Sequence, residues 1–216
     1  MGPQINHRPP SAPRDIELRL MQQGFRLIAG VDEVGRGPLA GPVVAAAVIM
    51  PHDCAVRGVT DSKALTRDQR DVAAAEIQRI AVCWSVGVVS AAEIDALNIL
   101  RATHEAMRRA LAALSQAPDF AVVDGLPVPG LPVPSEAVVK GDSLCYSVAA
   151  ASILAKVHRD ALMVELDGRY PGYGFARNMG YASAEHREAI RTRGPCPEHR
   201  RSFEPVKSLA QCAFDF

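Results

Sequence analysis

The sequence has few aromatic residues, no long apolar segment and no segment that resembles a targeting signal. Aromatic residues make up 5% of the 216 positions, and only one tryptophan is present. The longest apolar run, residues 43–50, lies between two prolines and is far too short to cross a bilayer. The N-terminus lacks the apolar stretch of a secretory signal peptide. We therefore expect a cytoplasmic protein.

Cysteine is scarce and poorly placed for cross-linking or for metal binding. The five cysteines are widely spaced, and no two of them form a C-x-x-C pair. This pattern argues against a disulfide framework and a four-cysteine zinc site, and it suits a reducing compartment. Cys196 and His199 form a lone C-x-x-H pair, which offers too few ligands for zinc. Cys145 falls in a predicted packed helix, where we expect a small core residue.

Net charge is also absent. The chain has 24 lysines and arginines and 24 aspartates and glutamates, so its formal net charge is zero. A basic excess would have indicated nucleic acid, but a local basic patch can act while an acidic site cancels it in the total. Solvated surface charge explains each basic residue equally well when it is taken alone. The candidates for a phosphate-binding surface are Lys63, Lys140, Lys156, Arg159, Arg200 and Arg201.

What the sequence does contain is enough for one folded domain. Hydrophobic residues make up 48% of the chain, and 216 residues can bury one substantial core. Residues 1–14 hold four prolines and few apolar groups, so we expect a flexible lead-in there. The rest, 15–216, is predicted to be a single catalytic domain that ends in a helical segment and a tail.

Apolar patterning predicts an α/β fold. The predicted strands are 25–34, 43–50, 83–89, 120–123 and 137–139. The predicted helices are 72–80 with a capping box at Thr66, a helix capped by Ser90, 98–114, 143–166 and 183–194. Short connections make the first three strands antiparallel neighbours, and a helical crossover sets the fourth strand parallel to the first. The result is a five-stranded mixed sheet flanked by helices.

Four acidic residues follow the predicted strands. Asp32 and Glu33 end the first strand, Asp124 ends the fourth, and Asp142 comes after the fifth. Ligand sites of such sheets lie beyond the carboxyl ends of the strands. Clustered carboxylates repel unless they bind protons or cations, and their hard oxygen atoms suit Mg²⁺ or Mn²⁺. Such ions, often paired, support in-line phosphoryl transfer, so the spacing predicts hydrolysis of a phosphodiester.

Each acid also has an ordinary structural explanation. Asp124 with Gly125 forms a common turn sequence, and Asp142 is well placed to cap a helix. Asp32 and Glu33 are adjacent, and adjacent strand residues point to opposite faces. Both therefore reach one site only if the strand ends or twists there. A nucleic-acid-binding module without catalysis stays open as an alternative.

The segment Gly35–Ala40 matches the dinucleotide-binding pattern G-x-G-x-x-A. That pattern needs a helix directly after it, whereas Pro42 and a predicted strand follow here. A nicotinamide-dependent oxidoreductase is therefore disfavoured. The glycines fit a tight connection between strands. They also fit a backbone that a sugar–phosphate chain approaches closely, with Arg36 supplying positive charge.

An ordered set of motifs resembles ribonuclease HII, the type 2 ribonuclease H family. The opening motif, residues 29–43, reads AGVDEVGRGPLAGPV. Further matching segments follow in order: Asp61-Ser62-Lys63, Val123-Asp124-Gly125, Lys140-Gly141-Asp142, residues 152–157 with Arg159-Asp160, Gly180-Tyr181, and residues 199–203. The resemblance covers nearly everything from about residue 25 to Phe203. The sister family, ribonuclease HIII, carries an extra N-terminal domain, for which residues 1–24 are too few.

The resemblance implies a ribonuclease H fold and a metal-dependent endonuclease. Such an enzyme hydrolyses the RNA strand of RNA–DNA hybrids and incises on the 5′ side of ribonucleotides embedded in duplex DNA, leaving a 3′-hydroxyl and a 5′-phosphate. It implies a role in removing misincorporated ribonucleotides. It also implies that Mn²⁺ or Mg²⁺, two ions per site, is held by Asp32, Glu33, Asp124 and Asp142.

The same resemblance implies a set of substrate-binding residues. The Gly35-Arg36-Gly37 segment and Tyr181 would recognise a ribose 2′-hydroxyl at an RNA–DNA junction, and Lys63 would bind the substrate nearby. This hydroxyl is what separates RNA from DNA at one position. Many relatives have lysine before the Gly-Tyr pair, where this chain has Met179. Arg177 is a candidate replacement, although arginine and lysine are not equivalent.

The tail, Gln211–Phe216, has glutamine followed by two aromatic residues. It resembles the short peptides that dock on replication sliding clamps. Packing of Phe214 or Phe216 on the chain's own domain explains the pattern equally well.

Overall fold

The computed structural model describes residues 11–53, 56 and 58–208. The predicted docking segment, 211–216, lies outside the described residues. Five strands are present, as predicted: β1 (Ile28–Val34), β2 (Val43–Ile49), β3 (Cys83–Val89), β4 (Phe120–Asp124) and β5 (Ser135–Val138). The helices are α1 (Asp15–Gln22), α2 (Arg67–Ile80), α3 (Ala91–Leu97), α4 (Ile99–Ala112), α5 (Gly141–Leu144), α6 (Tyr146–Arg169), α7 (Phe175–Asn178) and α8 (Ala184–Arg193). A 3₁₀ turn, η1 (Ser62–Ala64), precedes α2.

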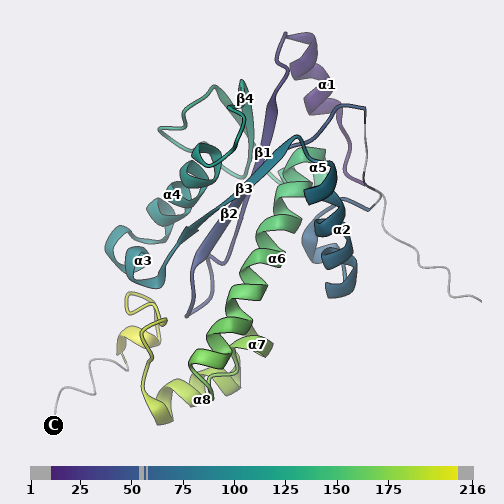
Figure 1. The fold of residues 1–216 in the computed structure, drawn as a ribbon. Helices are drawn as coiled ribbons and strands as arrows, with labels where there is room; N and C mark the ends of the chain where they lie inside the picture. Colours follow the sequence, from purple (N-terminus) through teal and green to yellow (C-terminus); the bar gives the residue numbers. More distant parts are fainter. Residues whose placement is uncertain (1–10, 54–55, 57, 209–216) are drawn as a thin grey trace, which may run out of the picture.

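The sheet has the predicted mixed topology, with strand order β3-β2-β1-β4-β5. The pairs β1–β2 and β2–β3 are antiparallel, whereas β4 runs parallel to β1 and β5 runs parallel to β4. Residues 28–31 of β1 pair with residues 120–123 of β4. The carboxyl ends of β1 and β4 therefore meet at one edge of the sheet (Figure 1).

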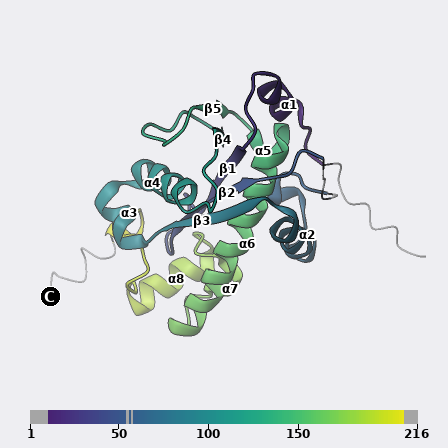
Figure 2. The same ribbon diagram turned by 45° about the horizontal axis from the view of Figure 1, so that its top comes forward.

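Helices cover both faces of the sheet, and Figure 2 shows α3 and α4 on one side and α2 and α6 on the other. All of β2 is buried. Its residues alternate between two cores, because Ala45 and Ala47 pack with α4 whereas Ala46 and Val48 pack with α2 and α6. The sheet is the shared wall of both cores, so a strand that shifts on one face disturbs the packing on the other.

Two glycines let the helices lie directly on the sheet. A Cβ atom at Gly30 of β1 would stand 2.1 Å from the backbone carbonyl carbon of Ser147 in α6. A Cβ atom at Gly87 of β3 would stand 2.1 Å from the backbone oxygen of Ala106 in α4. Side chains at these positions would push both helices away, so the glycines set the thickness of the layers.

The long helix predicted over 143–166 is in fact two helices. It breaks at Cys145, which is extended with φ −138° and ψ 123°. Glu17 of α1 supplies the reason, because its Oε1 accepts hydrogen bonds from the backbone N–H (2.8 Å) and the hydroxyl (3.0 Å) of Ser147. A carboxylate at a helix N-terminus satisfies free N–H groups and favours a helix start at that point.

Other boundaries differ modestly from prediction. The first strand begins at Ile28, because Phe25 packs on Phe120 with ring centroids 4.6 Å apart. The fifth strand covers 135–138 rather than 137–139. The packed chain also begins before residue 15: Ala12 is buried, and its N–H donates to the Val59 carbonyl at 2.8 Å. The helices α1 and α7 were not predicted.

The other four predicted helix starts are confirmed. Thr66 and Ser90 each form a complete capping box. The side chains of Asn98 and Ser183 accept from the backbone N–H groups of Arg101 and His186. Within the part of the chain that the structure describes, every helix is too short or too polar to span a membrane.

Candidate functional site

Three of the four predicted acids meet at the carboxyl edge of the central strands. Asp32 and Glu33 lie near the end of β1, and Asp124 is the last residue of β4. Each of the three offers a carboxylate oxygen within 4.8 Å of those of the other two. The parallel pairing of β1 with β4 is what brings together residues so far apart in the sequence.

Asp32 and Glu33 reach the same site although they are neighbours on one strand. Pairing with β4 stops at Val31, so the side of β1 beyond that residue is open. The Asp32 side chain turns toward the next residue, and its Oδ1 accepts from the Glu33 N–H at 2.7 Å. Glu33 Oε1 lies 3.3 Å from Arg36 Nη1. This contact holds the Glu33 carboxylate toward the loop after β1, residues 35–41, which we call the glycine loop.

Asp124 and Asp142 are joined through the backbone. Asp124 Oδ1 accepts from the Gly141 N–H at 2.6 Å. Asp142 is buried beside this contact, but it falls outside the three-acid cluster. Its Oδ2 lies 3.5 Å from Lys63 Nζ, and the same ammonium lies 3.7 Å from Asp61 Oδ1. Asp142 is therefore paired with Lys63 rather than grouped with the three clustered acids.

Burial and repulsion by neighbouring acids raise the pKa values of Asp32, Glu33 and Asp142. The pKa of Asp32 is raised well above its ordinary value by burial first, then by the charges of Glu33 and Asp124. Burial also raises the pKa of Glu33, against the lowering effect of Arg36. Burial and the charges of Asp61 and Asp124 raise the pKa of Asp142. Carboxylate oxygens that are buried and repel one another are well suited to bind a hard divalent cation.

The acids form one end of a cavity of about 400 Å³. The predicted glycine loop, Lys63 and Tyr181 also line it, so the structure brings these predicted residues together. Tyr181 is 48% exposed, and its Cε1 lies 3.8 Å from where a Cβ of Gly37 would be. The tyrosine ring and the glycine loop are therefore neighbours and form one continuous wall of this cavity.

Two polar lining residues, Ser62 and Ser152, were not predicted as site residues, and they lie beside Lys156, which was predicted for a phosphate-binding surface. Ser62, Ser152 and Lys156 line the same cavity. The Ser152 hydroxyl donates to the Ser62 hydroxyl at 2.9 Å, and Lys156 forms an ion pair with Asp160 at 2.7 Å. Ser152 and Lys156 are four residues apart on α6 and so share a helix face. That spacing was the available signal in the sequence.

Two of the six basic residues proposed for a phosphate-binding surface are instead fully buried. Arg159 donates to the backbone oxygens of Ala40, Pro42 and Met179, and Arg200 to those of the glycine loop. The prediction is therefore wrong for these two. Of the other four, Lys63 and Lys156 line the cavity, whereas Lys140 and Arg201 do not.

The suggested replacement for the missing lysine also fails. Arg177 forms an ion pair with Glu185, and it does not line the cavity. Met179 has a left-handed backbone with φ 50° and uses its carbonyl to accept from Arg159. Neither residue lines the cavity.

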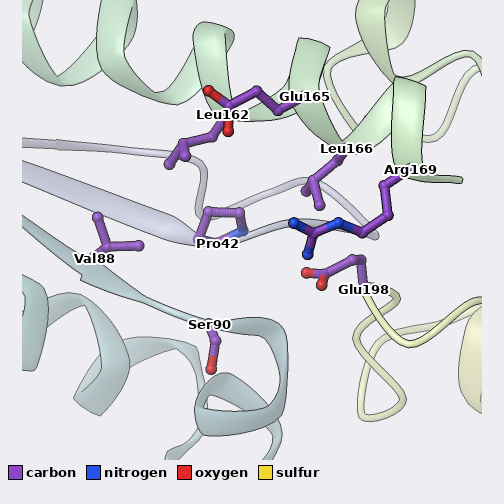
Figure 3. Close-up of a pocket in the computed structure, with 8 residues that line it drawn as sticks. All are labelled: Pro42, Val88, Ser90, Leu162, Glu165, Leu166, Arg169 and Glu198. Carbon is purple, nitrogen blue, oxygen red and sulfur yellow. The ribbon is translucent and has the colours of Figure 1, made fainter.

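A second cavity, of about 230 Å³, lies between the C-terminal half of α6 and the end of β3 (Figure 3). Its floor is apolar, formed by Pro42, Val88, Leu162 and Leu166, and its rim carries Ser90, Glu165, Arg169 and Glu198. The three-acid cluster, the one found among the described residues, lies in the other cavity. The chemistry therefore belongs to the cavity beside β1 and β4.

The loop after β1 also decides against a dinucleotide site. Gly35 has φ +93°, and a Cβ there would stand 2.2 Å from Arg159 Nε. The chain then enters β2 rather than a helix. A dinucleotide pyrophosphate needs a helix N-terminus at this place, and the loop does not provide one.

Comparison with known proteins agrees with this geometry. The sequence model of a family described as Ribonuclease HII matches residues 29–206. The chain is 54% identical over 197 residues to ribonuclease HII of Geobacillus kaustophilus, covering 91% of this chain and 75% of that one. It is 55% identical over 188 residues to ribonuclease HII of Moorella thermoacetica, covering 87% and 91%.

Solved structures show the same fold. The ribonuclease H2 of Pyrococcus horikoshii superposes with a TM-score of 0.75 at 30% identity, covering 88% of this chain and all of that one. An RNase HII from Archaeoglobus fulgidus, solved in complex with PCNA, superposes at 0.68 and 28% identity, covering 83% and 96%. A Bst-RNase HIII in complex with Mn²⁺ superposes at 0.68 and 21% identity, covering 99% and 77%. This last likeness concerns the fold alone.

Proposed function

The chain belongs to the ribonuclease HII family, and from this we propose that it is a metal-dependent endonuclease that hydrolyses the RNA strand of RNA–DNA hybrids. The observation that carries the proposal is the cluster of Asp32, Glu33 and Asp124 at one end of a cavity walled by the glycine loop. A module that only bound nucleic acid would gain nothing from buried carboxylates next to phosphate. We place this activity in a single catalytic domain and in the cytoplasm.

Four residues are proposed to hold the metal: Asp32, Glu33, Asp124 and Asp142. Two divalent ions, Mn²⁺ or Mg²⁺, would balance the charge of four carboxylates. Such ions supply an activated water and neutralise the charge that develops on the phosphate. The chain itself keeps Asp124 fixed through Gly141, keeps Glu33 near Arg36, and holds Asp142 against Lys63.

The wall of the cavity formed by the glycine loop and Tyr181 is proposed to recognise the ribose. Backbone groups of Gly35, Arg36 and Gly37 would contact the 2′-hydroxyl, and the exposed ring of Tyr181 would stack on the neighbouring deoxyribose. Lys63 and Lys156 lie at the rim, where a phosphate chain would pass. The family resemblance further implies incision on the 5′ side of an embedded ribonucleotide, leaving a 3′-hydroxyl and a 5′-phosphate, and we propose the same cut for this chain.

The test uses a DNA duplex with one embedded ribonucleotide, incubated with Mg²⁺, with Mn²⁺ and with a chelator. We expect metal-dependent incision 5′ to the ribonucleotide and no cleavage of an all-DNA control. Cleavage of long hybrids alone would keep the nuclease and remove the role in embedded ribonucleotides. Binding without cleavage of any substrate would favour the non-catalytic alternative.

We also propose that residues 211–216 dock on a replication sliding clamp. The motif Gln-x-x-Phe-x-Phe supports this, as does the RNase HII solved in complex with PCNA. Deletion of 211–216 should abolish clamp binding in a pull-down with purified clamp and leave cleavage of free duplex unchanged. Equal binding by the full-length and shortened chains, or none by either, would contradict the proposal.

A further inference from the structure

Arg200 is fully buried, yet among the described residues it forms no ion pair. Its guanidinium donates instead to three carbonyl oxygens of the loop after β1. Nη2 lies 2.6 Å from the oxygen of Gly35, Nη1 lies 2.9 Å from that of Arg36, and Nε lies 3.0 Å from that of Gly41. A buried charge is costly unless its N–H groups are used. Here the planar guanidinium of Arg200 hydrogen-bonds to both ends of the glycine loop, at Gly35 and at Gly41.

The adjacent residue, His199, reaches the other half of the proposed ribose-binding wall. Its Nε2 lies 3.0 Å from Nε2 of His186, and Nδ1 of His186 lies 2.8 Å from the backbone oxygen of Tyr181. Both rings are buried. A chain of two hydrogen bonds therefore connects His199 to the backbone of the tyrosine.

The neighbours of these rings assign every proton. A carbonyl can only accept, so His186 carries its proton on Nδ1 and accepts at Nε2. His199 must then donate from Nε2. Its Nδ1 accepts from the Cys196 N–H at 3.0 Å, which agrees with this tautomer. Both imidazoles are neutral, and burial lowers the pKa of each.

Backbone hydrogen bonds also connect these segments to one another. The Arg200 N–H donates to the Leu39 carbonyl at 2.8 Å, and the Leu39 N–H donates to the Gly180 carbonyl at 2.8 Å. The Gly41 N–H donates to the Glu198 carbonyl at 2.9 Å. The glycine loop, the Gly180–Tyr181 turn and residues 198–200 are thus one hydrogen-bonded unit.

We propose that His199 and Arg200 are positioning residues for ribose recognition. Arg200 sets the glycine loop, and His199 sets Tyr181 through His186, so that the two halves of the wall keep one spacing before substrate arrives. Both residues are at most 1% exposed, so their proposed role is to position the residues that line the cavity. Recognition of a single hydroxyl needs such preorganisation, because errors of about 1 Å are costly. The inference rests on the proposed function.

Three variants test the proposal. His199→Leu removes the donor to His186, whereas His199→Gln keeps an N–H donor near the same place. Arg200→Lys keeps the charge and loses the fork. Ile77→Ala is the matched control, because Ile77 is buried in the core between α2 and α6, away from the glycine loop, and its truncation lowers stability.

The measured quantity is a ratio: the incision rate at a single embedded ribonucleotide divided by the rate on a long hybrid, with the cut position mapped. We expect this ratio to fall about 10- to 100-fold in His199→Leu and Arg200→Lys. His199→Gln should stay within about threefold of the unaltered chain. Ile77→Ala should lower the melting temperature without changing the ratio.

An unchanged ratio in folded His199→Leu or folded Arg200→Lys would overturn the proposal, as would an equal fall in Ile77→Ala. If one of the two does not fold, the other decides alone, since each acts on a separate half of the wall. If the unaltered chain cuts neither substrate with metal present, the proposed function itself has failed, which is a distinct result.

Discussion

The Asp124 carboxylate accepts a hydrogen bond from the Gly141 N–H at 2.6 Å, and this bond joins the end of β4 to the segment that carries Asp142. Two of the four proposed metal-binding residues are therefore fixed relative to each other before any cation binds. A Cβ at Gly141 would stand 3.3 Å from Asp124 Oδ1, so there is little room for a side chain here. The backbone around Asp124 and Gly141 is therefore preorganised.

Asp124→Asn separates the charge of this residue from its structural bond. The amide oxygen can still accept from Gly141, so we expect a folded protein. Loss of one anionic metal ligand should lower the rate of hybrid cleavage at least 100-fold, measured at saturating Mn²⁺. Glu136→Gln, which removes an exposed carboxylate paired with Arg19, is the control and should cleave normally. Near-normal cleavage by folded Asp124→Asn would remove Asp124 from the metal site.

Asp32→Asn should stabilise the metal-free protein while it abolishes cleavage. The folded-state pKa of Asp32 is raised, so its ionised form opposes folding at every pH above the unfolded value. Removing the charge should raise Tm at pH 7 by about 2–4 °C, as expected for about 1 kcal/mol in a chain of this length. Asp71→Asn, on an exposed position of α2, should leave Tm unchanged. A lower Tm for Asp32→Asn in chelator would contradict the repulsion described above.

Added metal should reverse the order of the two melting temperatures, so that the unaltered chain melts at a higher temperature than Asp32→Asn. A cation that binds the folded state and not the unfolded state raises Tm by mass action. We expect a clear rise for the unaltered chain and a much smaller rise for Asp32→Asn. Equal shifts in both proteins would place the metal elsewhere. Calorimetric scans with Mn²⁺ and with chelator give all four values.

The buried histidine pair should make stability depend on pH. Burial, then the neighbouring His186, lowers the pKa of His199 from 6.5 to about 4 in the folded protein. Between these values the unfolded chain binds a proton that the folded chain does not, so stability falls as pH falls from 6.5 toward 4. The full loss is roughly 3 kcal/mol, and denaturant titrations at several pH values measure it. His199→Gln should flatten this dependence, and an unchanged slope would contradict the assignment.

Two glycine substitutions test how tightly α6 lies on the sheet. Gly30→Ala places a Cβ 2.1 Å from the Ser147 backbone, which should cost about 3 kcal/mol of unfolding free energy. Gly168→Ala, within α6 itself, meets nothing within 4 Å. It should stabilise by about 0.5–1 kcal/mol, because alanine favours a helix over glycine. Equal effects from both would show that the predicted clash at Gly30 is relieved.

Tyr181→Ala tests the role of the tyrosine ring in ribose recognition. The ring is exposed and adjacent to Gly37, so its loss should change folding little. We expect the preference for a single embedded ribonucleotide over all-DNA duplex and long hybrid to fall about tenfold or more. Tyr181→Phe keeps the ring and should keep the preference. Unchanged selectivity in Tyr181→Ala would rule out the stacking role.

Much of this architecture could be predicted from local sequence. The alternation in β1, the capping boxes at Thr66 and Ser90, and acids placed after strands are short-range signals, and each is confirmed as structure. The meeting of Asp32 and Asp124 also followed, because parallel strands deliver their carboxyl ends to one edge. The sequence therefore predicted where three of the four acids meet.

What it could not predict depends on contacts between distant segments. The break at Cys145 is explained by Glu17, and no local pattern shows that a carboxylate of another helix caps α6. Arg159 and Arg200 read as surface charge, since burial against carbonyl groups is set by tertiary packing. The turn of Asp142 toward Lys63 is likewise a property of the assembled site.

The pairing of residues 28–31 with 120–123 has a consequence for how the chain becomes active. The antiparallel strands β1, β2 and β3 are close in sequence and can form early, whereas β4 must close a long loop onto β1, which is intrinsically slow. Asp32 and Asp124 meet only when that closure is complete. A chain in which β4 has not yet paired with β1 therefore carries all the residues of the motif but lacks the assembled acid cluster, and its cutting activity depends on this long-range pairing as well as on synthesis of the motif.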